Sequence, residues 1–208
     1  VRNHFDCQNL TGARLENQPT NEYDCFGSHW DERLFFTESM GAIFSELTNI
    51  LSPLTLALLE DSGWYRSNYT DASLSTFGHL AGCDFVDKPC IIDGQVPPWS
   101  DGFFCNKQLQ YDAHGQPIIQ AMCDITTHHV AVCDLVDRFI LGMAKVPEEY
   151  FYFDNHNLGP INDYKQANFC PMPTIDVYSC DDTEKKPGVM GETFGPSSRC
   201  YNFEMAAA

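Results

Sequence analysis

The sequence predicts an α+β chain whose two parts differ in character, with a boundary near residue 91. Three observations lead to this prediction. A helix with clear start and stop signals falls at 53–62, in the first part. Beyond about residue 92, prolines, glycines and cysteines separate short extended segments. Ten cysteines among 208 residues are typical of a disulfide-bonded protein.

The first part, residues 1–91, opens with turn-forming residues and is expected to be loop with short extended pieces up to about residue 30. Its clearest element is the helix. Ser52 suits the N-cap, Pro53 suits the first helical position, and Gly63 suits a left-handed C-cap. Because apolar residues fall on nearly every face, we expect this helix to be buried. A loop with short strands is expected over residues 73–90.

The second part, residues 92–208, is expected to be loop-rich and poor in strands. Short extended candidates lie at 127–134 and 150–153, between positions occupied by proline and glycine. The sequence contains no internal repeat and no low-complexity segment. These features favour a small module held together by disulfides rather than by a large sheet.

The charge of the chain argues against two classes of partner. Lys and Arg number 12 against 29 Asp and Glu, which gives a formal net charge of −17 at pH 7. Nucleic-acid binding requires a basic surface, and anionic lipid attracts basic segments, so neither partner is expected. The 43% of hydrophobic residues is enough for a folded core.

Cysteine usage and glycosylation sequons predict the secretory route, with an extracellular or cell-surface location. None of the cysteines forms a CxxC pair or has zinc-finger spacing, so disulfides are the favoured interpretation. Sequons begin at Asn9 and Asn68. We find neither a signal peptide nor a membrane-spanning stretch, so membrane association would depend on segments outside this chain. The missing initiator Met suggests a fragment of a longer precursor.

No complete catalytic motif is present, since the sequence lacks HExxH, GxSxG and P-loop patterns. His128 and His129 would point to opposite faces of a strand, which argues against joint metal binding. The remaining histidines without ligand-like spacing are interpreted as structural, and they are His4, His79, His114 and His156.

One segment stands out: Gly27-Ser28-His29-Trp30-Asp31-Glu32-Arg33, followed by Glu38-Ser39-Met40-Gly41. It resembles the leishmanolysin family of metzincin zinc peptidases, and within it the invadolysin branch. In that family an HExxH helix supplies two zinc histidines and the general-base glutamate, and a later segment supplies the third histidine. His29 matches the third ligand, and Met40, eleven residues further on, matches the Met-turn beneath the metal.

The resemblance extends over nearly the whole chain. Its other landmarks, in the family's order, lie at 2–7, 15–18, 55–65, 82–90, 130–133, 149–154 and 194–200. It implies that residues 1–91 form the C-terminal half of a metzincin catalytic region, and that residues 92–208 begin a cysteine-rich C-terminal domain that continues past this end.

The resemblance also implies one catalytic Zn²⁺, held by His29 and by two histidines outside this chain. Such a zinc keeps one position for water. The general-base glutamate is expected upstream, and no pattern gives that role to Glu32, Glu38 or Glu46. The fragment alone is therefore expected to be inactive. The alternative for His29 is a histidine bonded to backbone, and for Met40 it is ordinary core packing.

The family pattern further implies four disulfides: Cys7–Cys83, Cys90–Cys170, Cys105–Cys133 and Cys123–Cys200. The partner of Cys180 would lie beyond residue 208, and Cys25 has no counterpart in the pattern. Both are therefore expected to be free or irregular. Sequence spacing alone does not fix such pairings.

Two functions remain open at this point. By resemblance, the parent protein is a zinc metalloendopeptidase that cleaves peptide bonds in proteins, in a family linked to cell adhesion. The alternative is a non-catalytic, disulfide-stapled adhesion or binding module. An HExxH motif upstream of this chain favours the enzyme, and its absence favours the module.

Overall fold

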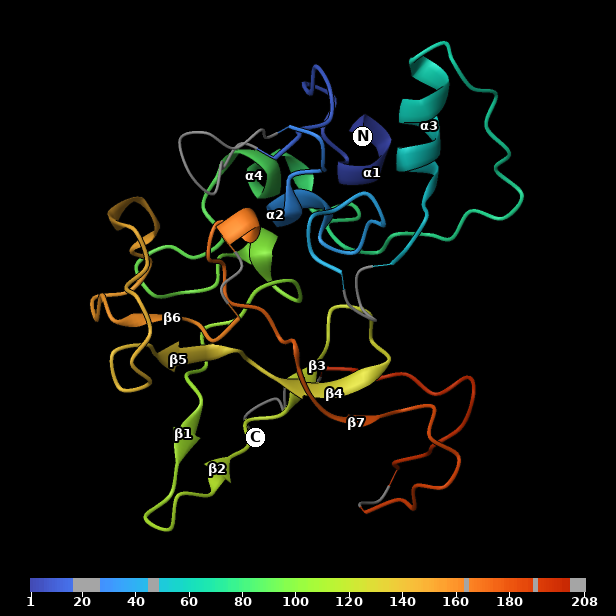
Figure 1. Ribbon diagram of the computed structural model, residues 1–208. Helices are drawn as coiled ribbons and strands as arrows, with labels where there is room; N and C mark the ends of the chain where they lie inside the picture. Colours follow the sequence, from blue (N-terminus) through green and yellow to red (C-terminus); the bar gives the residue numbers. More distant parts are fainter. Residues whose placement is uncertain (17–26, 45–48, 163–164, 189–190, 203–208) are drawn as a thin grey trace. The chain divides into compact units, whose positions relative to one another are not determined.

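The computed structural model describes residues 1–16, 27–44, 49–162, 165–188 and 191–202, and it contains both helices and strands (Figure 1). Two compact units form. Unit 1 comprises Val1–Ile92, Pro97–Ser100 and Asp163–Cys170. Unit 2 comprises Asp93–Val96, Asp101–Asn162 and Pro171–Ala208. The assignment of the two parts to a catalytic region and a cysteine-rich module stays a prediction.

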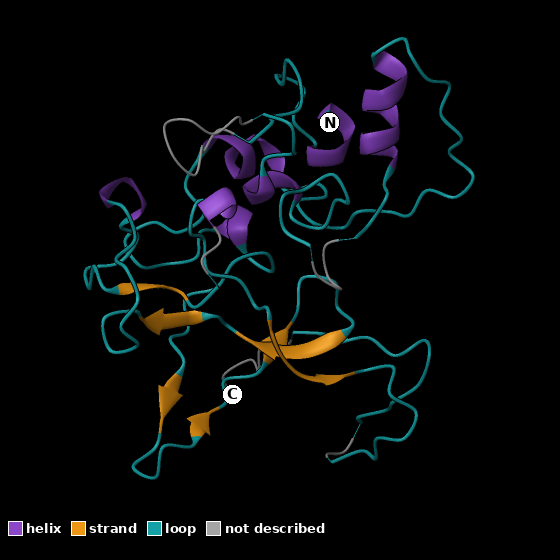
Figure 2. Cartoon of the chain, viewed as in Figure 1, coloured by secondary structure: helices purple, strands orange, loops and turns teal. Residues whose placement is uncertain are grey.

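Unit 1 is built from short helices and loops (Figure 2). Its elements are α1 (Arg2–Phe5), α2 (Glu32–Phe35), α3 (Pro53–Asp61), α4 (Gly82–Asp87), and the 3₁₀ helices η1 (Pro98–Ser100) and η3 (Lys165–Ala167). In this unit α1 packs against α4, and α2 packs against η3.

An aromatic cluster forms the core of unit 1. The ring centroid of Phe5 lies 5.4 Å from that of Phe35 and 5.8 Å from that of Phe85. Phe77 lies 5.9 Å from Phe85 in an edge-on arrangement, which suits the ring quadrupoles. The backbone of Gly78 approaches this cluster so closely that a Cβ there would meet Phe5 and Phe85 carbons at 2.7 Å.

Unit 2 contains all the strands of the described residues, together with the 3₁₀ helix η2 (Glu148–Tyr150). The strands are β1 (Gln110–Tyr111), β2 (Pro117–Ile118), β3 (Met122–Cys123), β4 (His129–Val132), β5 (Leu135–Asp137), β6 (Leu158–Pro160) and β7 (Ile175–Ser179). They form the antiparallel pairs β1–β2 and β5–β6 and the antiparallel sheet β3–β4–β7, in which a bulge separates Val130 from Ala131. Such short strands cannot bury much by themselves, and the packing centres on Cys105, Cys133 and Leu135.

The four disulfides of the described residues lie within the units, two in each. Cys7–Cys83 joins the end of α1 to α4, and Cys90–Cys170 joins the 163–170 segment to the rest of unit 1. Cys105–Cys133 and Cys123–Cys200 cross unit 2. These are the same pairs that the family resemblance implied. Cys180 is a free, buried thiol, and Cys25 lies outside the described residues.

The helix expected after Ser52 forms, but its predicted burial is wrong. The Ser52 hydroxyl accepts a hydrogen bond from the Leu54 N–H at 3.0 Å, so it caps α3 as expected. Within α3 only Thr55 and Leu56 are buried, and Leu58 is 36% exposed. Apolar residues lie on nearly every face of this helix, so the sequence did not indicate which face packs against the core. In the structure, the buried face is the one that carries Thr55 and Leu56.

Two local expectations also fail. Residues 82–87 form helix α4 instead of loop and strand, because buried Phe85 and Val86 and the Cys83 disulfide hold this short helix in place. Residues 150–153 do not form a strand. Pro147 starts the 3₁₀ turn η2 there, and its carbonyl accepts a hydrogen bond from the Tyr150 N–H at 2.9 Å.

Candidate functional site

His29 lies in a short antiparallel ladder just before α2. The Glu16 N–H donates to the His29 carbonyl at 3.0 Å, and the Asp31 N–H donates to the Arg14 carbonyl at 3.1 Å. Between them, Leu15 and Trp30 form an isolated bridge. Asp31 then caps α2 by accepting from the Arg33 N–H at 3.1 Å. The backbone around His29 is therefore fixed on both sides.

One nitrogen of the His29 ring has a carboxylate partner among the described residues. Its Nδ1 lies 2.9 Å from the Glu16 Oε2. The His29 side chain is 44% exposed, whereas the Glu16 side chain is only 8% exposed. A carboxylate beside one ring nitrogen is the usual support of a histidine that binds metal through the other. Nε2 is thus the donor atom that His29 can offer.

The Glu16 carboxylate is held in its ionised form. Burial raises the pKa of this group, but the hydrogen bond and charge of His29 and backbone bonds from Ser28 and Gly27 outweigh burial, so the pKa lies below its ordinary value. The other oxygen, Oε1, lies 3.4 Å from both the N–H and the hydroxyl of Ser28. An ionised carboxylate can only accept hydrogen bonds, which fits a position between these donors.

Met40 is joined directly to the segment that carries His29. The Trp30 N–H donates to the Met40 carbonyl at 3.0 Å, and the Gly41 N–H donates to the Glu38 carbonyl at 3.0 Å. Met40 itself is half-buried. The fold therefore brings the turn at 38–41 beside Trp30, the residue that follows His29.

A buried chain of polar side chains lies behind this turn. The Trp30 Nε1–H donates to the Thr55 hydroxyl at 2.9 Å, and that hydroxyl donates to the Glu38 Oε2 at 2.8 Å. Burial raises the pKa of Glu38 above its ordinary value, while hydrogen bonds that include those from Ser52 and Thr55 act in the opposite direction. Through Thr55, helix α3 is tied to both motif segments.

Glu32 occupies the space just after Met40. Its Oε1 accepts from the Ile43 N–H at 2.7 Å, and a Cβ on Gly41 would meet that oxygen at 2.4 Å. Burial raises the pKa of Glu32 to about 8. A larger residue at position 41 would therefore require the Glu32 carboxyl group to shift. Through these contacts Glu32 has a structural role: it holds residues 41–43 in place.

Arg33 anchors α2 to the end of α4. Its Nη2 donates to the Phe85 carbonyl at 2.8 Å and to the Val86 carbonyl at 2.6 Å. These carbonyls belong to the last turn of α4, where a cation is favourable. The ladder, the turn and the two helices thus form one scaffold around His29.

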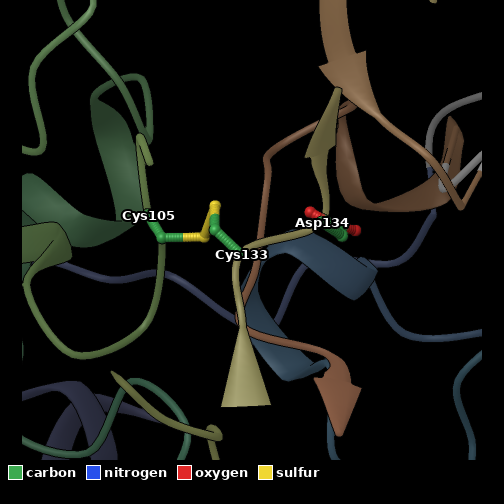
Figure 3. Close-up of side chains that lie close together, drawn as sticks. All are labelled: Cys105, Cys133 and Asp134. Carbon is green, nitrogen blue, oxygen red and sulfur yellow. A yellow bond between two sulfur atoms is a disulfide. The ribbon is translucent and has the colours of Figure 1, made fainter. Parts of the chain in front are cut away.

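A cluster of Cys105, Cys133 and Asp134 has the spacing of a metal site, but its chemistry excludes one. Figure 3 shows the sulfur atoms of Cys105 and Cys133 joined in a disulfide; Asp134 is the residue that follows Cys133. A disulfide sulfur has no thiolate to offer a metal. The Asp134 carboxylate instead accepts from the Met172 N–H at 2.8 Å and lies 3.4 Å from the Thr174 hydroxyl.

Asp134 should make the stability of unit 2 depend on pH. It is fully buried, and burial raises its pKa to about 8 against the hydrogen bonds that lower it. The unfolded value is about 3.9. The stabilisation linked to the protonated carboxyl is therefore complete below about pH 4. The free energy of unfolding then falls by up to about 1.4 kcal/mol per pH unit as pH rises, until the loss is complete just above pH 8.

We expect Asp134→Asn to flatten this dependence, because the amide oxygen keeps the bond from Met172 and carries no charge. Urea unfolding at pH 5 and pH 8 checks the result, with the exposed Asp101→Asn as control. A variant whose stability falls as steeply as that of the wild type would show that Asp134 stays ionised.

Other residues singled out in the sequence are two adjacent histidines, a glutamate and two sequon asparagines. His128 and His129 have different neighbours, Asp181 at 3.7 Å and Asp124 at 3.6 Å, so they do not form one site. Glu46 lies outside the described residues. Asn9 and Asn68, where the two sequons begin, are both exposed. Among the described residues, none of the helices is long and apolar enough to span a bilayer.

Comparison with known proteins shows that the chain belongs to a family of metallopeptidases. The family is that of leishmanolysin, whose model (Peptidase_M8) matches residues 1–207. The resemblance stated from the motifs is confirmed.

The chain is 34% identical to a leishmanolysin-like peptidase of Drosophila melanogaster over 97% of the chain and 31% of the relative. It is 25% identical to the leishmanolysin homolog of Crithidia fasciculata, over 97% of the chain and 28% of the relative. A ciliated left-right organizer metallopeptidase of Mus musculus is 39% identical over 46% of the chain and 13% of that protein. The chain thus spans about a third of the length of the first two relatives.

Proposed function

We propose that the parent protein, meaning the polypeptide that carries this chain with any segments beyond it, is a zinc endopeptidase. In this proposal His29 supplies the third zinc ligand through Nε2, and Met40 lies beneath the metal. The observation that carries the proposal is the bond between the Trp30 N–H and the Met40 carbonyl at 3.0 Å, which holds the two motif segments together. The family match over residues 1–207 supports it.

The residues present fit a zinc ion, though incompletely. The His29 side chain is half-exposed, and its Nδ1 lies beside a carboxylate, an arrangement that is usual for zinc-binding histidines. When bound, zinc would lower the pKa of its water to about 7 and polarise the scissile carbonyl. This chain would supply and orient one zinc ligand, His29, and Met40 would support the site. The two further histidines and the glutamate that moves the proton belong to segments outside it.

The proposed substrates are proteins or peptides. We expect the 208-residue chain alone to bind zinc only weakly and to cleave nothing, since one imidazole does not replace three ligands. Zinc content and peptide cleavage, measured on the parent protein and on this chain, test the proposal. If the parent protein lacks HExxH and shows no zinc-dependent cleavage, the chain is a binding or adhesion module instead. A link to cell adhesion stays a prediction.

We also propose that the protein passes through the secretory route, which the four disulfides support. Asn68 is then expected to carry a glycan. It is exposed, and its Oδ1 accepts from the Thr70 N–H at 3.1 Å in a surface turn. Mass spectrometry of protein secreted from eukaryotic cells should show one glycan fewer in Asn68→Gln. An unmodified Asn68 in that preparation would contradict the expectation.

A further inference from the structure

Two separate hydrogen bonds join Glu16 and His29. One is between main chains, from the Glu16 N–H to the His29 carbonyl at 3.0 Å. The other is between side chains, Glu16 Oε2 to His29 Nδ1 at 2.9 Å. The ladder of residues 14–16 with 29–31 places the two residues opposite each other, so the side-chain contact is built on a fixed backbone register.

The contact is asymmetric in burial. The Glu16 side chain is 8% exposed and the His29 side chain is 44% exposed. Ser28 lies at the second carboxylate oxygen, with both its N–H and its hydroxyl 3.4 Å away. One oxygen therefore faces Ser28 and the other faces the imidazole. The contact thus joins a buried carboxylate to a half-exposed imidazole.

We propose that Glu16 is a positioning residue that holds His29 in its Nδ1–H tautomer and thereby presents the Nε2 lone pair outward for metal binding. The inference deepens the proposed function and rests on His29 being a zinc ligand. A carboxylate oxygen 2.9 Å from Nδ1 accepts a hydrogen bond when that nitrogen carries the ring proton. In this arrangement Nδ1 donates to Glu16, and Nε2 keeps the lone pair that a metal can use.

A purely structural role would predict something different. If Glu16 only tied two loop segments together, the main-chain bonds of the ladder would serve that purpose without its carboxylate. The carboxylate adds control over the proton position and orientation of the ring. Such partners typically strengthen metal binding by about 10–100-fold.

The first test measures the tautomer in this chain directly. Long-range ¹⁵N–¹H correlation spectra of the 208-residue chain, labelled with ¹⁵N-histidine, report which ring nitrogen carries the proton. We expect the Nδ1–H form of neutral His29 in the wild type, in Glu16→Gln, which keeps an oxygen acceptor, and in the exposed control Glu60→Gln. We expect Glu16→Ala to shift His29 towards the Nε2–H form. An unchanged tautomer in folded Glu16→Ala overturns the inference.

The second test measures zinc affinity of the parent protein by competition with a chelator. We expect Glu16→Ala to weaken binding about 10–100-fold, Glu16→Gln to weaken it less, and Glu60→Gln to leave it unchanged. If His29→Ala weakens zinc binding but neither Glu16 variant does, the positioning role is wrong and the proposed function stands. If His29→Ala has no effect on zinc, the proposed function fails and this inference fails with it. Should the Ala variant not fold, Glu16→Gln decides the zinc test: unchanged affinity in that variant, with a loss in His29→Ala, overturns the inference.

Discussion

Replacing His29 by alanine in the parent protein is expected to abolish peptide cleavage and to release or loosen zinc. Two remaining ligands cannot reproduce the three-ligand site that leaves a position for water. The loss should be confined to the metal. His29 is half-exposed, and the ladder around it is made by main-chain atoms, so the disulfide framework should stay folded.

Zinc content and cleavage rate, measured together on the same preparations, check this prediction. His114→Ala is the matched control, since His114 is an exposed histidine in unit 2. Met40→Leu should be much milder because it conserves volume and apolarity, with a cost in stability under about 1.5 kcal/mol. Full zinc and full activity in His29→Ala would make His29 an ordinary structural histidine.

The second large effect is expected from removing the Cys90–Cys170 disulfide by a double substitution to alanine. Both cysteines are fully buried, and the bridge spans 80 residues of sequence. Opening so long a loop should lower the free energy of unfolding by about 2–5 kcal/mol, mainly by freeing the unfolded chain. The 163–170 segment should be affected first, because this bridge fastens it to unit 1.

Urea unfolding of the double variant against the wild type measures that loss. Cys180→Ala is the control, since Cys180 is a buried cysteine that forms no disulfide. It removes a side chain of the same kind without opening a loop. Equal stability of the double variant and the wild type would mean that packing alone holds the segment in place.

The sequence contained part of the fold in local signals. Ser52 and Pro53 mark a helix start because capping and proline geometry act within a few residues, and α3 begins there. Burial of α3 was mispredicted because it depends on which neighbours the chain brings to each face. Helix α4 was missed because one turn held by a disulfide and two buried residues leaves little periodic pattern.

The site divides in a similar way. His29 and Met40 were recognised through motif residues that adjoin them in the sequence. Glu16 lies within the 15–18 landmark, but sequence spacing does not reveal its contact with His29, which spans 13 residues through a ladder. Glu32 became interpretable only once its carboxyl group was placed against Gly41 and the Ile43 N–H. Contacts of this kind arise from tertiary packing.

The most direct test of the central claim is the position of the metal itself. A crystal structure of the zinc-loaded parent protein, with anomalous diffraction at the zinc edge, would locate the ion among its ligands. We expect zinc at about 2.0–2.1 Å from His29 Nε2, with Nδ1 still bonded to Glu16 and Met40 beneath the ion. Zinc bound elsewhere, with His29 Nε2 facing only water, would contradict the assignment of His29 as a ligand.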